Sequence, residues 1–297
     1  MKLLGLGDNV CDLYLHTKMM YPGGQVLNVA VNAARLGVWA EYLGVFGTDS
    51  MARHVQSVLD VEGVKHSRCR IFPGENGFAK VILKDGDRVF LGSNRGGVLQ
   101  KHPIILDCDD LDYCAQFQII HTSNNSFMDQ ELKKLKFLPG LVSYDFSTHW
   151  TEEERLDQVC PNIDFAFLSG SELTLEQAES VANRLMERGN MVVCITRGEK
   201  DALLYDGNIW LVQPPCLVSA VDTMGAGDSF AACLLTRVGQ ALEMDGLSCW
   251  NNPLYRMELL RTALQAAAEW SAQSCLTSGG LGHGTAIPKE FLEKISS

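Results

Sequence analysis

Short apolar runs alternate with longer segments of helical periodicity along this chain, and that pattern constrains the fold more than any other feature. An apolar run at Leu3–Leu6 precedes a segment, residues 25–36, whose apolar side chains recur at helical spacing. Later strand-like runs and helical segments lie at 41–46, 49–62, 118–121, 128–137, 141–146, 153–159, 164–169, 174–188 and 191–196. Strands that alternate with helices predict a mainly parallel sheet covered by helices on both faces.

Residues 68–92 interrupt this alternation with three short strand-like pieces joined by typical hairpin-turn dipeptides. In order, the pieces and turn signals are 68–72, Asn76-Gly77, 78–83, Asp85-Gly86 and 88–91. A small antiparallel sheet is not stable alone, so we expect it to cover an active-site mouth, a partner subunit or both. Residues 11–19 alternate weakly and are expected to add a strand to it.

The length and charge of the chain limit its class. Its 297 residues, 46% of them hydrophobic, fit one large α/β domain or two small ones and are enough for a sizeable core. There are 36 acidic and 25 basic side chains, so the formal net charge is −11. This charge repels nucleic acid and anionic membranes at long range, and we expect neither as a partner.

The cysteines and the N-terminus indicate a reducing compartment. Ten cysteines are scattered singly, without a Cys-x-x-Cys pair or histidines at metal-ligand spacing, and are expected to be reduced and mostly buried. The apolar run at the N-terminus is too short for a signal peptide, and no stretch approaches ~20 uncharged apolar residues. The sequence therefore predicts a cytoplasmic protein.

The run Asp222-Thr223-Met224-Gly225-Ala226-Gly227-Asp228 carries the strongest chemical signal, because it leads directly into an apolar helical segment. The bare backbone of Gly225, Ala226 and Gly227 lets N–H groups at the helix start point at an anion, and the helix dipole adds to the attraction. Asp228 then lies in the first helical turn, where it can accept the proton of a hydroxyl that attacks a phosphoryl group. The alternative interpretation is an ordinary helix-capping turn.

A second glycine pair, Gly23-Gly24, stands at the entry of the first long helix, with Asn28 one turn inside it. Small residues let a ligand approach the backbone, and the Asn28 amide offers both a donor and an acceptor to a polyol. Taken alone, this pattern fits an ordinary helix start better than a binding site.

Together the two runs resemble the two signatures of the ribokinase-like, or PfkB, carbohydrate and nucleoside kinases, Gly-Gly-x-x-x-Asn-x-Ala and Asp-Thr-x-Gly-Ala-Gly-Asp, in that family's order. The resemblance covers essentially all 297 residues. It implies a ribokinase-like three-layer α/β/α sandwich, one domain over 1–297 with a β-sheet lid at approximately 11–20 and 68–97. It also implies an ATP-dependent sugar kinase that uses Mg²⁺, with Asp228 as catalytic base and Gly225–Gly227 as anion hole. A requirement for a monovalent cation stays open.

The resemblance also assigns residues to the sugar substrate, namely Asp12, Gly23, Gly24 and Asn28. Asp8, a subfamily feature, is a further candidate whose negative charge suits a cationic amine. Arg95, which follows the lid strands, could reach a carboxylate or phosphate of the substrate. The alternatives are solvated acids in a strand-end turn and a surface arginine.

For the nucleotide, the run Thr196-Arg197-Gly198 resembles the family's Thr-x-Gly-x-x-Gly loop, although Asp201 replaces the last glycine. The resemblance implies that Thr196, Arg197 and Gly198 contact ATP together with Gly225 and Gly227. Glu172 matches the end of the family's Asn-x-x-Glu motif, with Ser169 in place of Asn. It is the candidate for the magnesium network, and a helix-entry acid is the alternative.

Several details resemble the fructosamine kinases, especially fructoselysine 6-kinases. They are Gly7-Asp8-Asn9 followed by Asp12, Asp87-Arg88-Val89-Phe90, Tyr144-Asp145-Phe146-Ser147 with Trp150, and Met224. The resemblance implies 6-phosphorylation of a fructosamine such as fructoselysine. A ribokinase, fructokinase or nucleoside-type kinase and a catalytically silent sugar-binding regulator stay open as alternatives. Unpaired edges of the predicted lid sheet further predict a homodimer.

Overall fold

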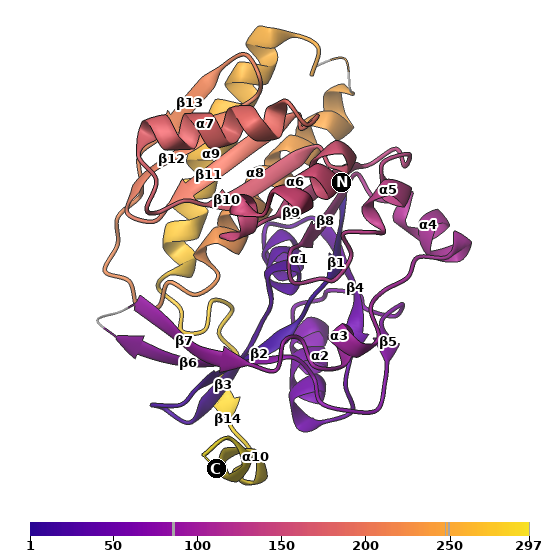
Figure 1. Ribbon diagram of the computed structural model, residues 1–297, viewed down its shortest axis with the longest axis vertical. Helices are drawn as coiled ribbons and strands as arrows, with labels where there is room; N and C mark the ends of the chain where they lie inside the picture. The colour runs from indigo at the N-terminus through magenta and orange to yellow at the C-terminus, as the bar shows by residue number, and fades with distance from the viewer. Residues whose placement is uncertain (85–86, 247, 249, 297) are drawn as a thin grey trace.

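The computed structural model describes residues 1–84, 87–246, 248 and 250–296, and it contains a large sheet and a small sheet (Figure 1). Among the described residues, the large sheet has the strand order β13-β12-β11-β10-β9-β8-β1-β4-β5. The strands from β11 to β5 pair in parallel, whereas β12 and β13 are antiparallel additions. Their bounds are β1 Lys2–Gly7, β4 Trp39–Phe46, β5 Arg70–Ile71, β8 Ile119–Ser123, β9 Leu141–Asp145, β10 Phe165–Ser169, β11 Val192–Arg197, β12 Lys200–Tyr205 and β13 Trp210–Gln213.

Helices cover both faces of this sheet because its strands bury side chains alternately on either side. On β10, Phe165 and Phe167 belong to one core, and Ala166 and Leu168 belong to the other. The first core includes α1 Gln25–Arg35, α2 Ser50–Val61, α8 Ala226–Asp245 and α9 Pro253–Ser274. The second includes α3 Val98–Lys101, α4 Cys108–Cys114, α5 Leu132–Leu135, α6 Glu153–Val159 and α7 Leu175–Met186. The three-layer α/β/α sandwich is therefore confirmed, although the helix predicted over 128–137 is reduced to one turn.

Helix α1 lies directly against β1, which requires a glycine on that strand. A Cβ atom at Gly5 would lie 2.9 Å from the carbonyl oxygen of Val26 and 3.0 Å from the Cβ of Ala30. The missing side chain lets the helix approach the sheet closely, as glycine does wherever backbones must come together. The start of α1 is thereby held close to the carboxyl end of β1.

The small sheet has the order β14-β3-β2-β6-β7 and lies at the carboxyl end of β1 (Figure 1). Its strands are β2 Val10–Tyr14, β3 Met19–Gly23, β6 Phe78–Lys84, β7 Asp87–Ser93 and β14 Thr285–Ala286, and α10 Lys289–Ser296 follows β14. Residues 10–23 thus supply two strands where the sequence indicated one. The predicted Asp85-Gly86 turn lies outside the described residues.

The prediction for 68–72 was wrong, because this piece belongs to the large sheet. Arg70–Ile71 pairs in parallel with Val45–Phe46 of β4, and α2 lies between the two strands in sequence. A strand that returns through a helix is expected to pair in parallel in the same sheet. The segment 285–286, which the sequence pattern did not reveal, supplies a strand of the small sheet instead.

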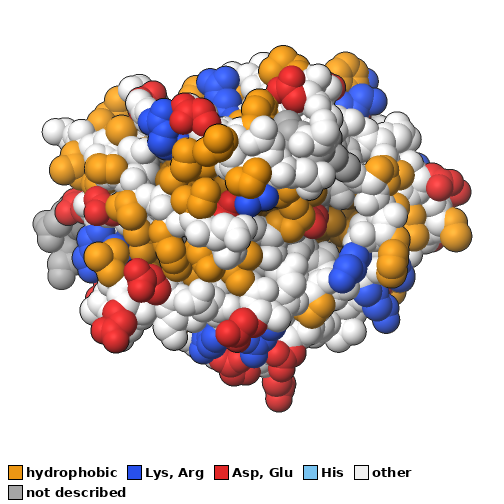
Figure 2. Space-filling model, turned by 90° about the horizontal axis from the view of Figure 1, so that it is seen from above, with side chains coloured by type: hydrophobic (Ala, Val, Ile, Leu, Met, Phe, Trp, Pro, Cys, Tyr) orange, Lys and Arg blue, Asp and Glu red, His pale blue; other side chains and the backbone are white. Residues whose placement is uncertain are grey.

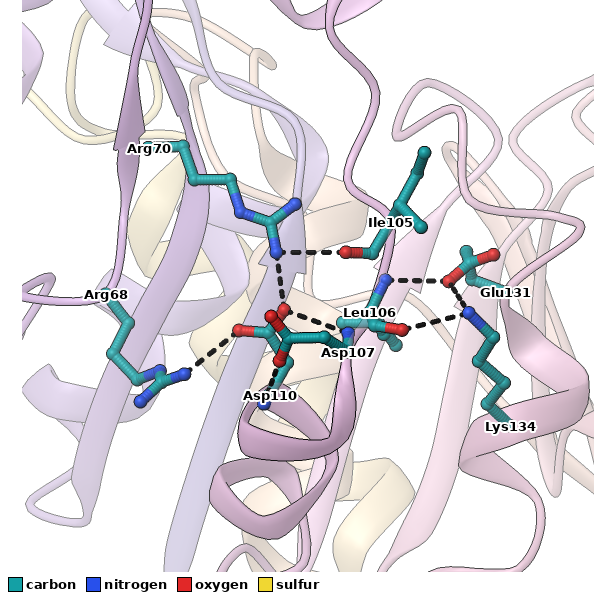
Figure 3. A network of polar contacts seen from close by, with 8 residues as sticks. All are labelled: Arg68, Arg70, Ile105, Leu106, Asp107, Asp110, Glu131 and Lys134. Carbon is teal, nitrogen blue, oxygen red and sulfur yellow. Dashed lines mark hydrogen bonds and ion pairs between the residues drawn. The ribbon is translucent and has the colours of Figure 1, made fainter.

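A charged network fixes this edge of the large sheet to the helical layer (Figure 3). The Asp110 carboxylate, in the first turn of α4, accepts hydrogen bonds from Arg68, at 3.1 Å, and from Arg70. Nearby, Glu131 Oε2 accepts from the backbone N–H of Leu106 at 2.7 Å and from Lys134 Nζ at 2.6 Å. These contacts hold together segments that are far apart in the sequence.

The surface mixes charges of both signs. Figure 2 shows one face of the molecule, on which Lys and Arg side chains lie interspersed with Asp and Glu and with patches of hydrophobic side chains. Among the described residues, none of the helices combines the length and the apolar character needed to cross a membrane.

Candidate active site

The two glycine motifs, 200 positions apart in sequence, meet in the structure. Asn28 Nδ2, on α1, donates a hydrogen bond of 2.7 Å to Oδ2 of Asp228, in the first turn of α8. Gly225 lies beside this pair, because a Cβ there would be 3.4 Å from Asn28 Nδ2 and 3.8 Å from the same carboxylate oxygen. The candidate base is therefore in direct contact with the candidate polyol ligand and adjacent to the glycine turn.

The glycine turn presents an uncapped helix N-terminus. Gly225 has a left-handed conformation with φ 73°, and no side chain caps the helix that follows. A Cβ at Gly227 would meet no atom within 4 Å, so this backbone faces open space. The carbonyl oxygen of Ala226 accepts hydrogen bonds from Ser271 Oγ at 2.8 Å and Ser229 Oγ at 3.0 Å, which fixes the turn. Such an exposed, fixed helix start fits the phosphate chain of a nucleotide.

Asp222 joins the glycine turn to the small sheet. Its Oδ2 accepts hydrogen bonds from the Tyr14 hydroxyl on β2, at 2.6 Å, and from the Gly279 N–H, at 2.7 Å. Its Oδ1 accepts from the Met224 N–H at 2.9 Å, and the side chain is completely buried. Sequence reasoning included Asp222 in the motif without giving it a task, and no local signal pointed to Tyr14.

Asp8 supports the start of α1. It is buried, and its carboxylate accepts bonds from the backbone N–H groups of Gln25, at 2.9 Å, and Val26, at 3.4 Å. The hydroxyls of Ser123, at 2.7 Å, and Ser126, at 3.3 Å, donate to the same carboxylate. Burial raises the pKa of Asp8, and these hydrogen bonds partly offset the rise. Three of these donors contact Oδ1 and one contacts Oδ2, so most of the acceptor capacity of Asp8 is used within the protein.

Asp12 lies against the glycine pair. It is buried on β2, and a Cβ at Gly23 would lie 2.2 Å from its Oδ2 atom, so a side chain at position 23 would displace the Asp12 carboxylate. At Gly24 the backbone has φ 110°, and a Cβ would lie 2.8 Å from Asn9 Cα. Gly24 also accepts the backbone hydrogen bond of Asn28 at 2.8 Å. The structure therefore groups these sugar-site candidates around the start of α1.

The nucleotide candidates at the end of β11 form a tight hairpin to β12. Thr196 Oγ1 donates to the carbonyl oxygen of Leu168 at 3.3 Å, and Gly198 is an exposed turn residue with φ 63°. Arg197 is buried, and its guanidinium donates to the carbonyl oxygen of Leu173 at 3.0 Å. This guanidinium braces the end of β11 against the loop before α7 instead of extending into solvent.

Glu172 and Arg95 are both exposed. Glu172 lies in the turn between β10 and α7, beside the end of β11, because Ser169 and Thr196 are paired in register. Arg95 has a positive φ of 54°, and its backbone N–H donates to Ser93 Oγ at 3.1 Å. In the part of the chain that the structure describes, no three His, Cys, Asp or Glu residues gather as a metal site. The exposed carboxylate of Glu172 is the kind of group that Mg²⁺ takes, since Mg²⁺ usually keeps several waters and binds mainly to substrate phosphates with one or two carboxylates.

Comparisons with known proteins identify the family. The model described as pfkB family carbohydrate kinase matches residues 9–280. Fructosamine kinase FrlD of Bacillus subtilis is 38% identical over 285 residues, which cover 96% of this chain and 94% of that protein. Fructoselysine 6-kinase of Escherichia coli is 31% identical over 233 residues, covering 78% of this chain and 87% of that protein. A fructokinase of Xylella fastidiosa with bound ATP has a similar fold, with a TM-score of 0.75 at 20% identity, covering 100% of this chain and 99% of that one. The resemblance seen in the two motifs is confirmed: this chain belongs to the pfkB family of carbohydrate kinases and is an ATP-dependent sugar phosphotransferase.

Proposed function

We propose that this kinase transfers the γ-phosphate of ATP to the 6-hydroxyl of a fructosamine such as fructoselysine, in the cytoplasm. Two relatives that cover 96% and 78% of this chain are named for fructosamine and fructoselysine substrates, which supports the choice of acceptor. The cytoplasmic location is supported by the cysteine pattern, because the ten cysteines are scattered singly rather than arranged as a disulfide framework.

The hydrogen bond between Asn28 and Asp228 is the observation that carries the mechanism. It holds one oxygen of the Asp228 carboxylate at 2.7 Å from the Asn28 amide and so fixes the direction of the base. Asp228 accepts the proton of the sugar hydroxyl as that oxygen forms its bond to the γ-phosphorus and the bond to the leaving ADP breaks. Asp12 and Asn28 orient the neighbouring hydroxyls by hydrogen bonding.

The backbone of the glycine turn stabilises the charge on the transferred group. N–H groups at the uncapped start of α8 donate hydrogen bonds where negative charge develops, and the helix dipole adds to this effect. Thr196 and Gly198 contact the nucleotide at the end of β11, and Glu172 is the residue that would hold Mg²⁺. When bound, Mg²⁺ neutralises part of the phosphate charge.

The small sheet serves as a lid that excludes water from the reacting groups. Water beside the activated phosphate would be phosphorylated in place of the sugar, so kinases need such a cover. The Tyr14–Asp222 hydrogen bond supports this role, because it ties a lid strand to the glycine turn. We also propose that two copies pair through the lid, since β7 is an edge strand on which Val89, Phe90 and Leu91 are exposed.

A panel of acceptors tests the proposed function. The purified kinase is given fructoselysine, fructose, ribose and adenosine at equal concentration, and ADP release is measured. We expect the highest kcat/KM with fructoselysine and a product phosphorylated at the 6-hydroxyl. Preference for a free sugar or a nucleoside would contradict the fructosamine assignment. Binding of sugar without any ADP release would favour a catalytically silent regulator.

A further inference from the structure

Asp145 is a buried carboxylate at the ligand-binding edge of the large sheet. It is the last residue of β9 and pairs in register with Ser123, the last residue of β8. Open α/β sheets bind ligands outside the carboxyl ends of their strands, next to the point where the strand order reverses. That point lies between β1 and β8, because the chain passes from β1 to β4 on one side and later to β8 on the other. Asp145 therefore lies one strand away from it.

Asp145 lacks the positive partner that a buried carboxylate usually has. Its side chain is 8% exposed. Oδ1 accepts a hydrogen bond of 2.6 Å from the Ser147 N–H, and the nearby Gln25 side chain lowers the pKa of the carboxyl group. In the described ranges, no Lys, Arg or His forms an ion pair with it. Buried acids are rarely left without a counter-charge or a full set of donors, so a group that the chain does not supply is expected here.

The surroundings of Asp145 are neutral or negative. Burial raises the pKa of Asp145 to about 6, and the negative charge of Asp8 acts in the same direction. Asp145 also interacts electrostatically with the Cys194 thiol on β11 and with the adjacent Tyr144, neither of which is positive. Gln25, which links Asp145 to the start of α1, is neutral. A bound cation would stabilise the ionised carboxylate in this environment.

Unpartnered acceptors accompany this carboxylate. Asn124 follows β8, and its backbone N–H donates to the Asp145 carbonyl oxygen at 2.9 Å. Its side chain is 9% exposed, and its Oδ1 atom is buried without a hydrogen-bond partner. The Oδ1 atom of Asn28, beside Asp228, is likewise buried without a partner. Acceptors of this kind can be satisfied by the N–H and O–H donors of a sugar derivative.

We propose that Asp145 binds the secondary ammonium group of a fructosamine and thereby selects it over a neutral sugar. This inference rests on the proposed function. The ammonium supplies two N–H donors and the positive charge that the carboxylate lacks, and charge-assisted hydrogen bonds of this kind are strong. The carboxylate interacts with Gln25 at the start of α1, the helix that also carries Asn28. Four donors from the protein already contact Asp8, whereas Asp145 has fewer, so Asp145 takes the role that the sequence suggested for Asp8.

Two acceptors that differ at one atom test this role. They are fructoselysine and a fructose derivative that has an ether oxygen in place of the amine nitrogen. Asp145→Asn keeps the size of the side chain and removes its charge. We expect the variant to lower kcat/KM for fructoselysine about 10- to 100-fold, and that for the ether less than about threefold.

Asp164→Asn is the matched control. Asp164 is a partly buried acid that accepts the Val142 N–H at 2.7 Å, and it precedes β10 at the opposite end of the strands. We expect this variant to keep the wild-type preference for fructoselysine. A change in preference as large as that of Asp145→Asn would show a general effect of losing a buried acid, and the inference would be wrong.

The outcomes separate this inference from the proposed function. If the wild type prefers fructoselysine and Asp145→Asn keeps that preference, or loses both acceptors equally, the ammonium role is wrong and the proposed function stands. If the wild type does not distinguish the amine from the ether but still prefers fructoselysine to fructose, ribose and adenosine, the ammonium role is wrong and the proposed function stands. If it prefers a free sugar or a nucleoside, the proposed function is wrong. If Asp145→Asn lowers kcat/KM for fructoselysine but not for the ether, the result supports both the ammonium role and the proposed function.

The pH dependence of the wild type provides a second measurement that does not require a variant to fold. Asp145 must be ionised to bind an ammonium, and its pKa in the free protein is about 6. We therefore expect KM for fructoselysine to rise as the pH falls below that value, while KM for the ether stays constant. Equal rises for the two acceptors, or no rise for either, would overturn the inference.

Discussion

One hydrogen bond, from Asn28 to Asp228, brings together residues from two distant helices at the scale of single side chains. We expect Asp228→Asn to lower kcat about 10²- to 10⁴-fold, because the amide cannot accept the proton of the attacking hydroxyl. The measurement is ADP release with saturating sugar and ATP. Asp245→Asn, at the other end of the same helix, is the control and should keep wild-type activity. If Asp228→Asn retained more than about a hundredth of the activity, that residue would not be a general base.

Single residues also show where sequence reasoning succeeds. Asp228 and the turn before it were identified because the order glycine, alanine, glycine, aspartate is specific to few kinds of site. The residues that make this site are also adjacent in the sequence. Tyr14 and its hydrogen bond to Asp222 were missed, because nothing in the sequence around a strand tyrosine indicates a partner 208 positions away. The hydrogen bonds to Asp8 were missed for the same reason, since Ser123 ends β8 and Ser126 follows it, 115 and 118 positions further along the chain.

At the scale of one element, the start of α8 depends on two glycines for different reasons. Gly225 has φ 73°, so we expect Gly225→Ala to lower the free energy of unfolding by about 1–2 kcal/mol.

Gly227 is helical, and a Cβ there meets no atom within 4 Å. We expect Gly227→Ala to leave stability unchanged or raise it by up to ~1 kcal/mol, while KM for ATP rises because a methyl group enters the phosphate site. Urea unfolding and steady-state kinetics measure both effects, and an unchanged KM in Gly227→Ala would contradict the placement of ATP.

The link between the β5 region and α4 stabilises the fold and takes no part in catalysis. Asp110 is buried and accepts hydrogen bonds from Arg68 and Arg70, both of which are partly exposed. We expect Asp110→Asn to lower the free energy of unfolding by about 1–2 kcal/mol and to leave KM for sugar and ATP unchanged. Asp109→Asn, on the exposed neighbour, should be neutral within about 0.5 kcal/mol. Equal stability of the two variants in urea would contradict this role of Asp110.

Elements of the large sheet were predictable wherever local pattern and tertiary environment agree. Leu3–Leu6 and 164–169 are apolar runs that become buried central strands, and the helix at 49–62 begins at Asp49, whose side chain caps it. Arg70–Ile71 was assigned to the wrong sheet because a two-residue strand carries no information about its partner. The partner is set by the preceding helix, which returns the chain parallel to β4.

At the scale of the whole molecule, the exposed edge of the small sheet determines the expected assembly. Strand β7 is unpaired along one side among the described residues, and Phe90 is 55% exposed on it. We expect a homodimer in solution, because exposed strand edges with apolar side chains tend to be covered by a second copy. Light scattering of the purified protein measures the mass, and Phe90→Glu should shift it toward the monomer. A monomeric wild type at working concentration would contradict this assembly.

The position of strand β14 near the end of the chain affects how the enzyme folds during synthesis on the ribosome. Thr285–Ala286 pairs with β3 and comes after every candidate site residue in the chain. During synthesis, the residues proposed to bind the nucleotide and the sugar can therefore come together before the small sheet is complete. A protein cut short before this segment would keep its complete set of chemical groups, yet it would expose a bare strand to neighbouring molecules.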